Sequence, residues 1–154
     1  MLKGIPTILS PELLKVLDEM GHTDEITIAD GNFPGHTMGQ RVIRLDGHGV
    51  PEILDAILQV FPLDRYPNSK GEVDPPCTLM SVEPHEADKV KTPIWDEYKR
   101  IVKAREGLDE SAFKEINKWD FYEQTKEKST VVVMSTETAI YANIILRKGV
   151  VINN

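Results

Sequence analysis

Strand-like runs alternate with helix-like segments along the whole of this chain of 154 residues. The strand-like runs are short and rich in Ile, Val and Thr, whereas the helix-like segments repeat apolar residues every three or four positions. Parallel strands need crossover connections, usually helices, and those helices cover both faces of the sheet. The alternation therefore predicts an α/β fold, with a mostly parallel sheet covered by helices, in a single domain of residues 1–154.

Cap and turn residues set the expected limits of these elements. We expect strands at residues 25–29, 41–45, 78–82, 130–134 and 142–146, and helices at residues 11–20, 51–61, 93–103 and 120–127. Ser10 is a good N-cap for the first helix, Gly21 is placed to end it in the left-handed conformation, and Asp120 is the expected cap of the last helix. Residues 113–117 fit either a strand or a continued helix. Residues 62–76 hold four prolines and predict a long surface loop or a lid.

Charge and hydropathy exclude two classes of partner. The formal net charge of −7 opposes binding to nucleic acid, because phosphate contacts need clustered Lys and Arg. No run approaches the roughly 18–20 apolar residues of a membrane span, and the first residues do not resemble a signal peptide. The single cysteine, Cys77, has no partner for an intrachain disulfide and no local cations to activate its thiol, which indicates a free structural residue. We therefore expect a cytoplasmic protein with no nucleic-acid or membrane partner.

Three polar residues flank the first expected strand. His22 and Asp24 precede it, and Asp30 follows it at the carboxyl end, the edge where open α/β sheets bind ligands. Histidine is the side chain whose unperturbed pKa, about 6.5, lets it both take and give a proton near neutrality. His22 is therefore a candidate for proton transfer, although a single loop histidine is more often a solvated or packing residue.

A phenol and an amide lie two residues apart near the other end of the chain. If residues 140–146 are extended, Tyr141 and Asn143 project from the same side of the strand, where both can hydrogen-bond to sugar hydroxyls. The alternative is a tyrosine packed in the core with the asparagine in a turn. Trp95 and Trp119 fit packing at least as well as sugar stacking.

Metal and nucleotide sites find little support in the spacing of the histidines and glycines. His36 and His48 sit among glycines and, with Asp30, form an imaginable metal set, but their spacing matches no i,i+4 helical pair and no zinc signature. The glycine-rich turns also fail to match a phosphate-binding loop. His85 has the sequence context of a surface residue. We expect no metal ion and no cofactor.

Taken together, these segments resemble the family of D-ribose pyranases and L-fucose mutarotases over nearly the whole chain. The shared marks are GHTD at residues 21–24, the strand end at Asp30, and YANIIL at residues 141–146 followed by Gly149. DGNFPGHTMG at residues 30–39 and FPLDRY at residues 61–66 are similar to the fucose branch. The resemblance implies an isomerase that interconverts the α and β anomers of L-fucose without a cofactor.

The resemblance also implies roles for particular residues. His22 would be the proton donor, and the sugar would be held by Asp30, Tyr141, Ala142 and Asn143. The family's basic ligand residue falls at Lys118, where fucose mutarotases often carry Arg, which can pair bidentately as Lys cannot. The resemblance further implies a homo-oligomer, often a ring-like decamer, with the site near a subunit boundary. A D-ribose pyranase, or a sugar-binding module without catalysis, remains the alternative function.

Overall fold

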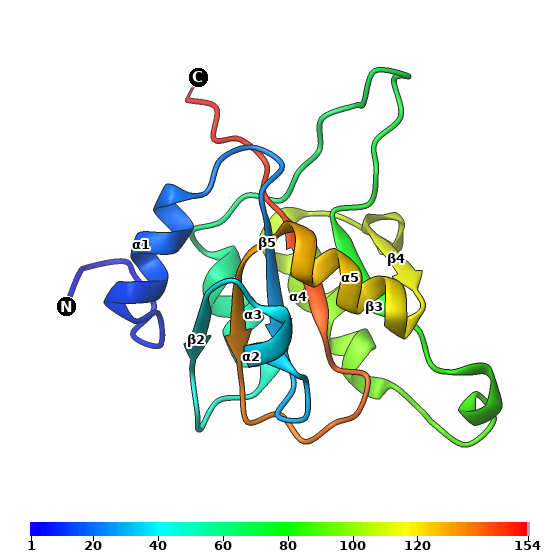
Figure 1. The fold of residues 1–154 in the computed structure, drawn as a ribbon. Helices are drawn as coiled ribbons and strands as arrows, with labels where there is room; N and C mark the ends of the chain where they lie inside the picture. The colour runs from blue at the N-terminus through cyan, green and yellow to red at the C-terminus, as the bar shows by residue number, and fades with distance from the viewer. Residues whose placement is uncertain (154) are drawn as a thin grey trace.

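The computed structural model describes residues 1–153 and is built around a six-stranded sheet of order β2-β5-β1-β6-β3-β4 (Figure 1). The strands are β1 (Glu25–Ala29), β2 (Val42–Arg44), β3 (Cys77–Met80), β4 (Phe113–Ile116), β5 (Ser129–Met134) and β6 (Ile144–Arg147). The helices are α1 (Pro11–Glu19), α2 (Gly35–Met38), α3 (Val50–Leu58), α4 (Pro93–Glu106) and α5 (Lys118–Lys128), with 3₁₀ turns η1 (Pro84–Glu86) and η2 (Glu110–Ala112).

The sheet is mostly parallel, as expected. β1 and β2 each run parallel to β5, and β3 runs parallel to β4. β6 is the exception, because it lies between β1 and β3 and runs antiparallel to both. Its register pairs Ile28 with Ile144 and Glu25 with Arg147. The carboxyl end of β1 therefore lies beside the start of β6, and this junction positions the site described below.

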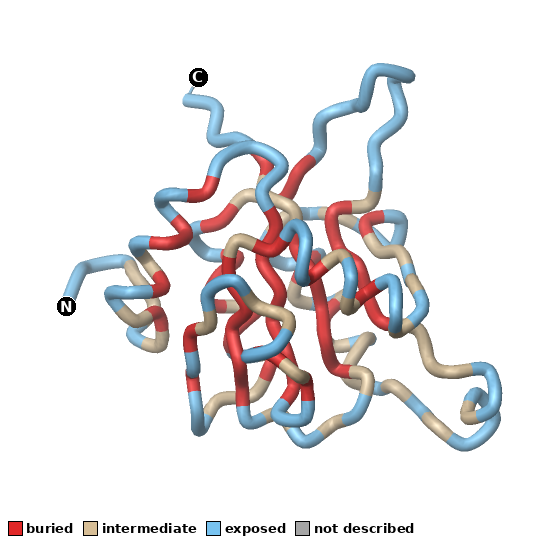
Figure 2. The backbone as a smooth tube through the Cα atoms, viewed as in Figure 1, coloured by how far each residue is buried: buried red, intermediate tan, exposed pale blue. Residues whose placement is uncertain are grey.

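Helices cover both faces of the sheet. The larger apolar cluster packs α1, α3 and α4 against one face and includes Ile26 and Ile28 of β1. The smaller cluster lies on the other face, where α2 and α5 sit, and includes Phe33 and Phe121. Figure 2 shows the result as buried strands and helix faces surrounded by exposed loops. Within residues 1–153, no helix is both long and apolar enough to span a bilayer.

Several expected boundaries are wrong, for local physical reasons. α1 ends at Glu19 with Met20 extended, so Gly21 is not a left-handed cap; Thr23, at φ 73°, holds the left-handed conformation instead. α5 begins at Lys118, because the side chain of Asn117, and not that of Asp120, accepts a hydrogen bond from the first turn. Of the ambiguous residues 113–117, the first four form β4, because pairing with β3 fixes them as a strand, and Asn117 caps α5.

Candidate functional site

A pocket of about 170 Å³ lies where β1 ends and β6 and α5 begin. It is lined by Asp30, Asn32, Phe33, Met80, Lys118, Tyr122, Ile140, Tyr141 and Asn143. Four residues predicted to hold a sugar therefore meet here, although up to 113 positions of sequence separate them. A larger apolar groove of about 830 Å³ is lined by α1 and both ends of the chain, and it contains none of the predicted site residues.

Asp30 is the buried carboxylate of the pocket, with only 5% of its surface exposed. Its N–H donates to Asn143 Oδ1 (2.8 Å), and its Oδ1 accepts from the N–H of Asn32 (3.0 Å). Burial raises the pKa of the Asp30 carboxyl, although hydrogen bonds from the backbone of Asn32 and Ala142 and from the Asn143 side chain act against the rise. A carboxyl held in this way has an elevated affinity for a proton and a fixed orientation.

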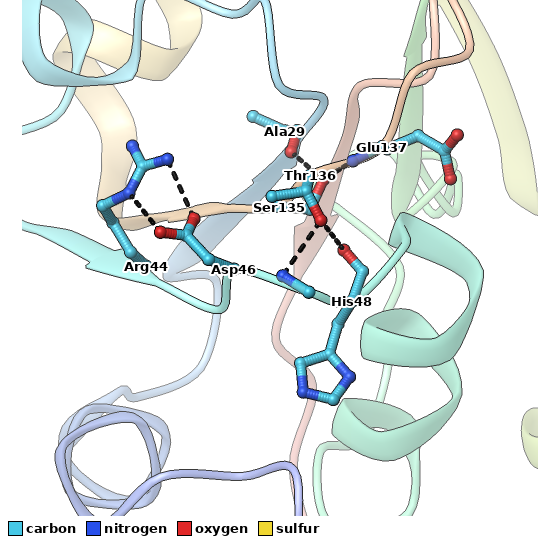
Figure 3. A network of polar contacts seen from close by, with 8 residues as sticks. Ala29, Arg44, Asp46, His48, Ser135, Thr136 and Glu137 are labelled. Carbon is cyan, nitrogen blue, oxygen red and sulfur yellow. Dashed lines mark hydrogen bonds and ion pairs between the residues drawn. The ribbon is translucent and has the colours of Figure 1, made fainter.

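A polar network joins the end of β1 and the loop before α3 to the segment that follows β5 (Figure 3). Ser135 Oγ donates to the carbonyl oxygen of Ala29 (2.7 Å), and the N–H of Thr136 donates to the carbonyl oxygen of His48 (3.1 Å). Beyond Asp30, the N–H of Gly31 donates to the carbonyl oxygen of Glu137 (2.9 Å). Since both neighbours of Asp30 are tied to the loop that follows β5, its main chain is fixed before any ligand binds.

The turn that carries Tyr141 differs from the prediction. The expected extended segment begins only at Ile144, and Tyr141 has φ 57° in the left-handed region, so Tyr141 and Asn143 do not project as i and i+2 of one strand. Both still line the pocket, because a turn brings them there. α4 holds this turn: Trp95 Nε1 donates to the carbonyl oxygen of Tyr141 (2.8 Å), and the buried hydroxyl of Tyr98 donates to that of Ala142 (2.7 Å).

Ala142 and Tyr141 contribute in different ways. Ala142 is fully buried and does not line the pocket, so its contribution is through its main chain. The Tyr141 hydroxyl donates to Glu86 Oε2 (2.6 Å) and accepts a long contact from the N–H of Glu83 (3.4 Å). Burial, and then the hydrogen bond to Glu86, raises the pKa of the Tyr141 phenol, so the phenol stays protonated at neutral pH.

Two further side chains of α5 complete the pocket wall. The ammonium group of Lys118 lies over the Trp119 ring, 5.0 Å from its centroid, and Trp119 is 68% exposed at the surface. Tyr122 packs edge-on against Phe33, with ring centroids 5.5 Å apart. Burial, and then the negative charge of Asp30, raises the pKa of the Tyr122 phenol, so Tyr122 is also a neutral hydrogen-bonding group in this pocket.

His22 lies at the opposite end of β1. Its Nε2 hydrogen-bonds to Asp64 Oδ1 (3.0 Å), and its ring meets Tyr66 edge-on at 5.6 Å between centroids. Arg147 Nε donates to Asp64 Oδ2 (3.0 Å). Burial alone would raise the pKa of Asp64, but hydrogen bonds from the Tyr66 N–H, His22 and Arg147 outweigh it and lower the pKa below its ordinary value. An ionised carboxylate therefore fixes the imidazole, whose side chain stays 40% exposed.

The structure does not bring His22 to the pocket within one copy of the chain. β1 contributes five residues between His22 and Asp30, so the strand alone separates them by roughly 17 Å. In Figure 1 the Asp30 end of β1 is at the bottom of the sheet, whereas residues 62–76 rise from the top. One copy thus presents a pocket that His22 does not line and, at the far end of β1, an exposed His22.

The remaining histidines and the cysteine have ordinary environments. His48, just before α3, pairs through Nδ1 with Oε2 of Glu52 in the first turn of that helix (2.9 Å). In the part of the chain that the structure describes, no group of three or more His, Cys, Asp and Glu side chains is arranged to hold a metal ion. Cys77 is buried in β3, and burial raises its thiol pKa, as suits the structural thiol predicted from the sequence.

Asp64, Tyr122 and Glu86 have clear contacts at these sites, but their roles were not predicted from the sequence. Asp64 belongs to the predicted loop or lid at residues 62–76, yet its contact with His22 joins positions 42 apart. Glu86 reaches Tyr141 across 55 positions. Tyr122 offered the one local signal, since it lies four residues, about one helical turn, beyond Lys118 and hence on the same face of α5.

Comparison with known proteins finds relatives whose sequence and fold are similar to this chain over almost its full length. The model of the RbsD / FucU transport protein family matches residues 3–151. The fucose mutarotase of Homo sapiens is 44% identical, and the match covers 99% of this chain and 96% of that protein. A fucose mutarotase from Streptococcus pneumoniae, solved in complex with L-fucose, has a TM-score of 0.88 and 41% identity, covering 98% of this chain and 100% of that one.

A third relative, the solved structure of FucU from Bifidobacterium longum, is 51% identical and has a TM-score of 0.89 over 97% of this chain and 100% of its own. The family model spans the site residues at both ends of β1 and the turn before β6. The match to each of these three relatives covers at least 97% of this chain. The chain belongs to the RbsD / FucU transport protein family.

Proposed function

We propose that this protein is an isomerase that interconverts the α and β anomers of L-fucose by opening and reclosing the pyranose ring. The observation that carries the proposal is the pocket at the end of β1, in which Asp30, Lys118, Tyr141 and Asn143 converge. The full-length similarity to a fucose mutarotase solved with L-fucose supports the same sugar. The pocket is small and mixed in polarity, which suits a monosaccharide better than a larger glycan.

The lining residues supply the hydrogen-bond types that a sugar needs. Asp30 and Asn143 offer a carboxylate and an amide, and Lys118 offers a charged donor. Phe33 and Met80 give the pocket an apolar wall, against which the less polar face of a 6-deoxy sugar can pack. These groups orient the ring, and orientation alone accounts for a large part of the rate of a ring-opening step.

Ring opening requires a proton to reach the ring oxygen while another leaves the anomeric hydroxyl. We assign the first transfer to His22, whose ring is fixed by Asp64 in the manner of a carboxylate that orients a catalytic imidazole. The second proton passes toward Asp30, whose raised pKa suits a base. The bond between the anomeric carbon and the ring oxygen breaks, and the open-chain aldehyde recloses on its other face. Both proton transfers then reverse, so no redox step or cofactor is needed.

The catalytic role proposed for His22 has to be reconciled with its position at the opposite end of β1 from the pocket. We propose that the protein is a homo-oligomer in which the His22 end of one copy faces the pocket of its neighbour. Apolar side chains at the His22 end support such a contact: Val60, Tyr66, Val151 and Ile152 are each at least 37% exposed. At the pocket end, Ile140 and Trp119 are exposed beside the site. A ring of copies would repeat this head-to-tail contact.

The expected cytoplasmic location also stays a proposal. It rests on Cys77, the single cysteine of the chain, which is buried and cannot form a disulfide with another residue of the same chain. Fractionation of the producing cells, followed by detection of the untagged protein, tests it. Recovery with periplasmic or secreted marker proteins would contradict it.

Proton NMR of equilibrated L-fucose tests the function directly. The α and β anomeric protons give separate signals, and the purified protein should transfer saturation from one signal to the other much faster than buffer does. The same spectra with D-ribose distinguish the pyranase alternative, which predicts faster exchange between pyranose and furanose signals. Binding of L-fucose without faster exchange would establish a sugar-binding module, and the enzyme assignment would then be wrong.

A further inference from the structure

The pocket residue Tyr141 has a partner outside the pocket that no part of the proposed mechanism uses. Glu86 comes from the loop of residues 81–92, and η1 (Pro84–Glu86) is its short ordered turn. We propose that Glu86 is a positioning residue for sugar binding. Because Glu86 accepts a hydrogen bond from the Tyr141 hydroxyl, the phenol oxygen is left to accept a hydrogen bond from a sugar hydroxyl. This inference rests on the proposed function.

The contact between the two side chains is short and charge-assisted. The Tyr141 hydroxyl lies 2.6 Å from Glu86 Oε2, within the range for a hydroxyl that donates to a carboxylate. Such a bond is roughly twice as strong as one between neutral groups. The phenol has one proton to donate, so with Glu86 in place Tyr141 has no donor left for the sugar.

The hydroxyl oxygen of Tyr141 can still accept one hydrogen bond of normal length. The N–H of Glu83 approaches it at 3.4 Å, which is long for a hydrogen bond. A sugar hydroxyl can donate a hydrogen bond to this oxygen. A carbonyl or ether oxygen placed there has no proton to donate and is repelled by the lone pairs of the phenol oxygen. Glu86 therefore favours a ligand that presents a hydroxyl at this point of the pocket, and this preference is a specificity element carried by the loop of residues 81–92.

The main chain of the turn is held without Glu86. Trp95 and Tyr98, both from α4, donate to the carbonyl oxygens of Tyr141 and Ala142 at 2.8 and 2.7 Å. Loss of the Glu86 carboxylate should thus free the direction of the Tyr141 hydroxyl while leaving the turn in place. Glu86 is only partly buried, so its replacement does not open a hole in the core. Removal of the Glu86 carboxylate should therefore change the direction of the Tyr141 hydroxyl without disturbing the turn or the core.

Glu86→Ala is the principal variant, Glu86→Gln its conservative partner and Asp88→Ala the matched control. Asp88 is an exposed acidic residue of the same loop, so its loss removes the same charge and leaves the contact intact. For L-fucose exchange followed by NMR, Glu86→Ala should raise KM by roughly tenfold and leave kcat within about twofold, since a binding contact equal in ground and transition state affects KM alone. Glu86→Gln should lie between, because its amide oxygen still accepts from the phenol, and Asp88→Ala should match wild type.

A double-variant comparison separates positioning from a general structural effect. In the Tyr141→Phe background there is no hydroxyl to orient, so Glu86→Ala should add no further change in KM. Loss of the carboxylate should also lower the pKa of Tyr141, seen by carbon NMR of labelled tyrosine rings without sugar. An unchanged KM in Glu86→Ala, or an equal rise with and without the Tyr141 hydroxyl, would overturn the inference while wild-type exchange upholds the proposed function. No exchange by wild type would overturn both.

Discussion

Replacing Asp64 by Asn should lower both the free energy of unfolding and the rate of L-fucose exchange. Asp64 accepts three hydrogen bonds at 3.0 Å, from the Tyr66 N–H, Arg147 Nε and His22 Nε2, with its side chain only 5% exposed. Hydrogen bonds to a charged group are each worth about 1.5–3 kcal/mol, and an amide retains part of them. Because the Arg147 side chain is 16% exposed and partly screened, we expect a net loss of about 2 kcal/mol in the free energy of unfolding at pH 7.

The pH dependence of this loss has a definite sign. The pKa of Asp64 is lowered in the folded chain, so its stabilisation is present above the unfolded pKa of about 3.9 and is lost as pH falls through the folded value. Urea unfolding should therefore show the full difference between wild type and Asp64→Asn at pH 7 and a smaller one near pH 3. Asp74→Asn removes an exposed carboxylate from the same loop and should show no such difference.

The same variant should slow L-fucose exchange by about 10²-fold, because a neutral amide no longer stabilises the protonated imidazole or fixes its ring. NMR saturation transfer measures this rate. An Asp64→Asn protein with wild-type stability at pH 7 and wild-type exchange would refute the reasoning for the His22–Asp64 pair. Normal stability with slow exchange would contradict only the energetic part.

Three further predictions concern the pocket. Tyr98→Phe leaves the buried carbonyl oxygen of Ala142 without its donor and should lower the free energy of unfolding by about 1–2 kcal/mol in urea titrations. Asp30→Asn should raise the free energy of unfolding at pH 7, since burial raises the pKa of this carboxyl and so disfavours its charged form, and the gain should disappear below the unfolded pKa. The same variant should abolish exchange, because it removes the proposed base. Lys118→Met should raise KM for L-fucose about tenfold, while Lys118→Arg should not, as kinetics over a range of sugar concentrations will show.

The fold was largely predictable from the sequence because its signals are local. β1 and α4 follow from short-range periodicity and from cap residues, and the structure places both close to the expected limits. The carboxyl end of β1 was likewise identified as a ligand-binding edge, and Asp30 lies there in the pocket. Helix ends were less predictable, since Gly21 and Asp120 competed with neighbouring residues that cap or turn the chain instead.

The candidate site was predictable only in part. Tyr141 lines the pocket, but the extended conformation predicted for it is wrong, because a hydrogen bond from Trp95 of α4 holds it in a turn. The partners of the site residues, Asp64 for His22 and Glu86 for Tyr141, come from loops without periodicity, and their contacts join positions 42 and 55 apart, so no local pattern indicated these pairings. The separation of His22 from Asp30 follows from strand geometry, because the five residues of β1 lie between them.

Mixed oligomers test most directly the claim that His22 of one copy acts on sugar in the pocket of another. His22→Ala and Asp30→Asn should each be inactive alone. Coexpressed with different tags and purified through both, they should recover between about one quarter and one half of wild-type exchange per site, because a site works when an intact histidine faces an intact pocket, which is about one site in two in a mixed dimer and approaches one in four in a large ring. Recovered activity of this size supports the account. Mixed oligomers as inactive as either parent would contradict it.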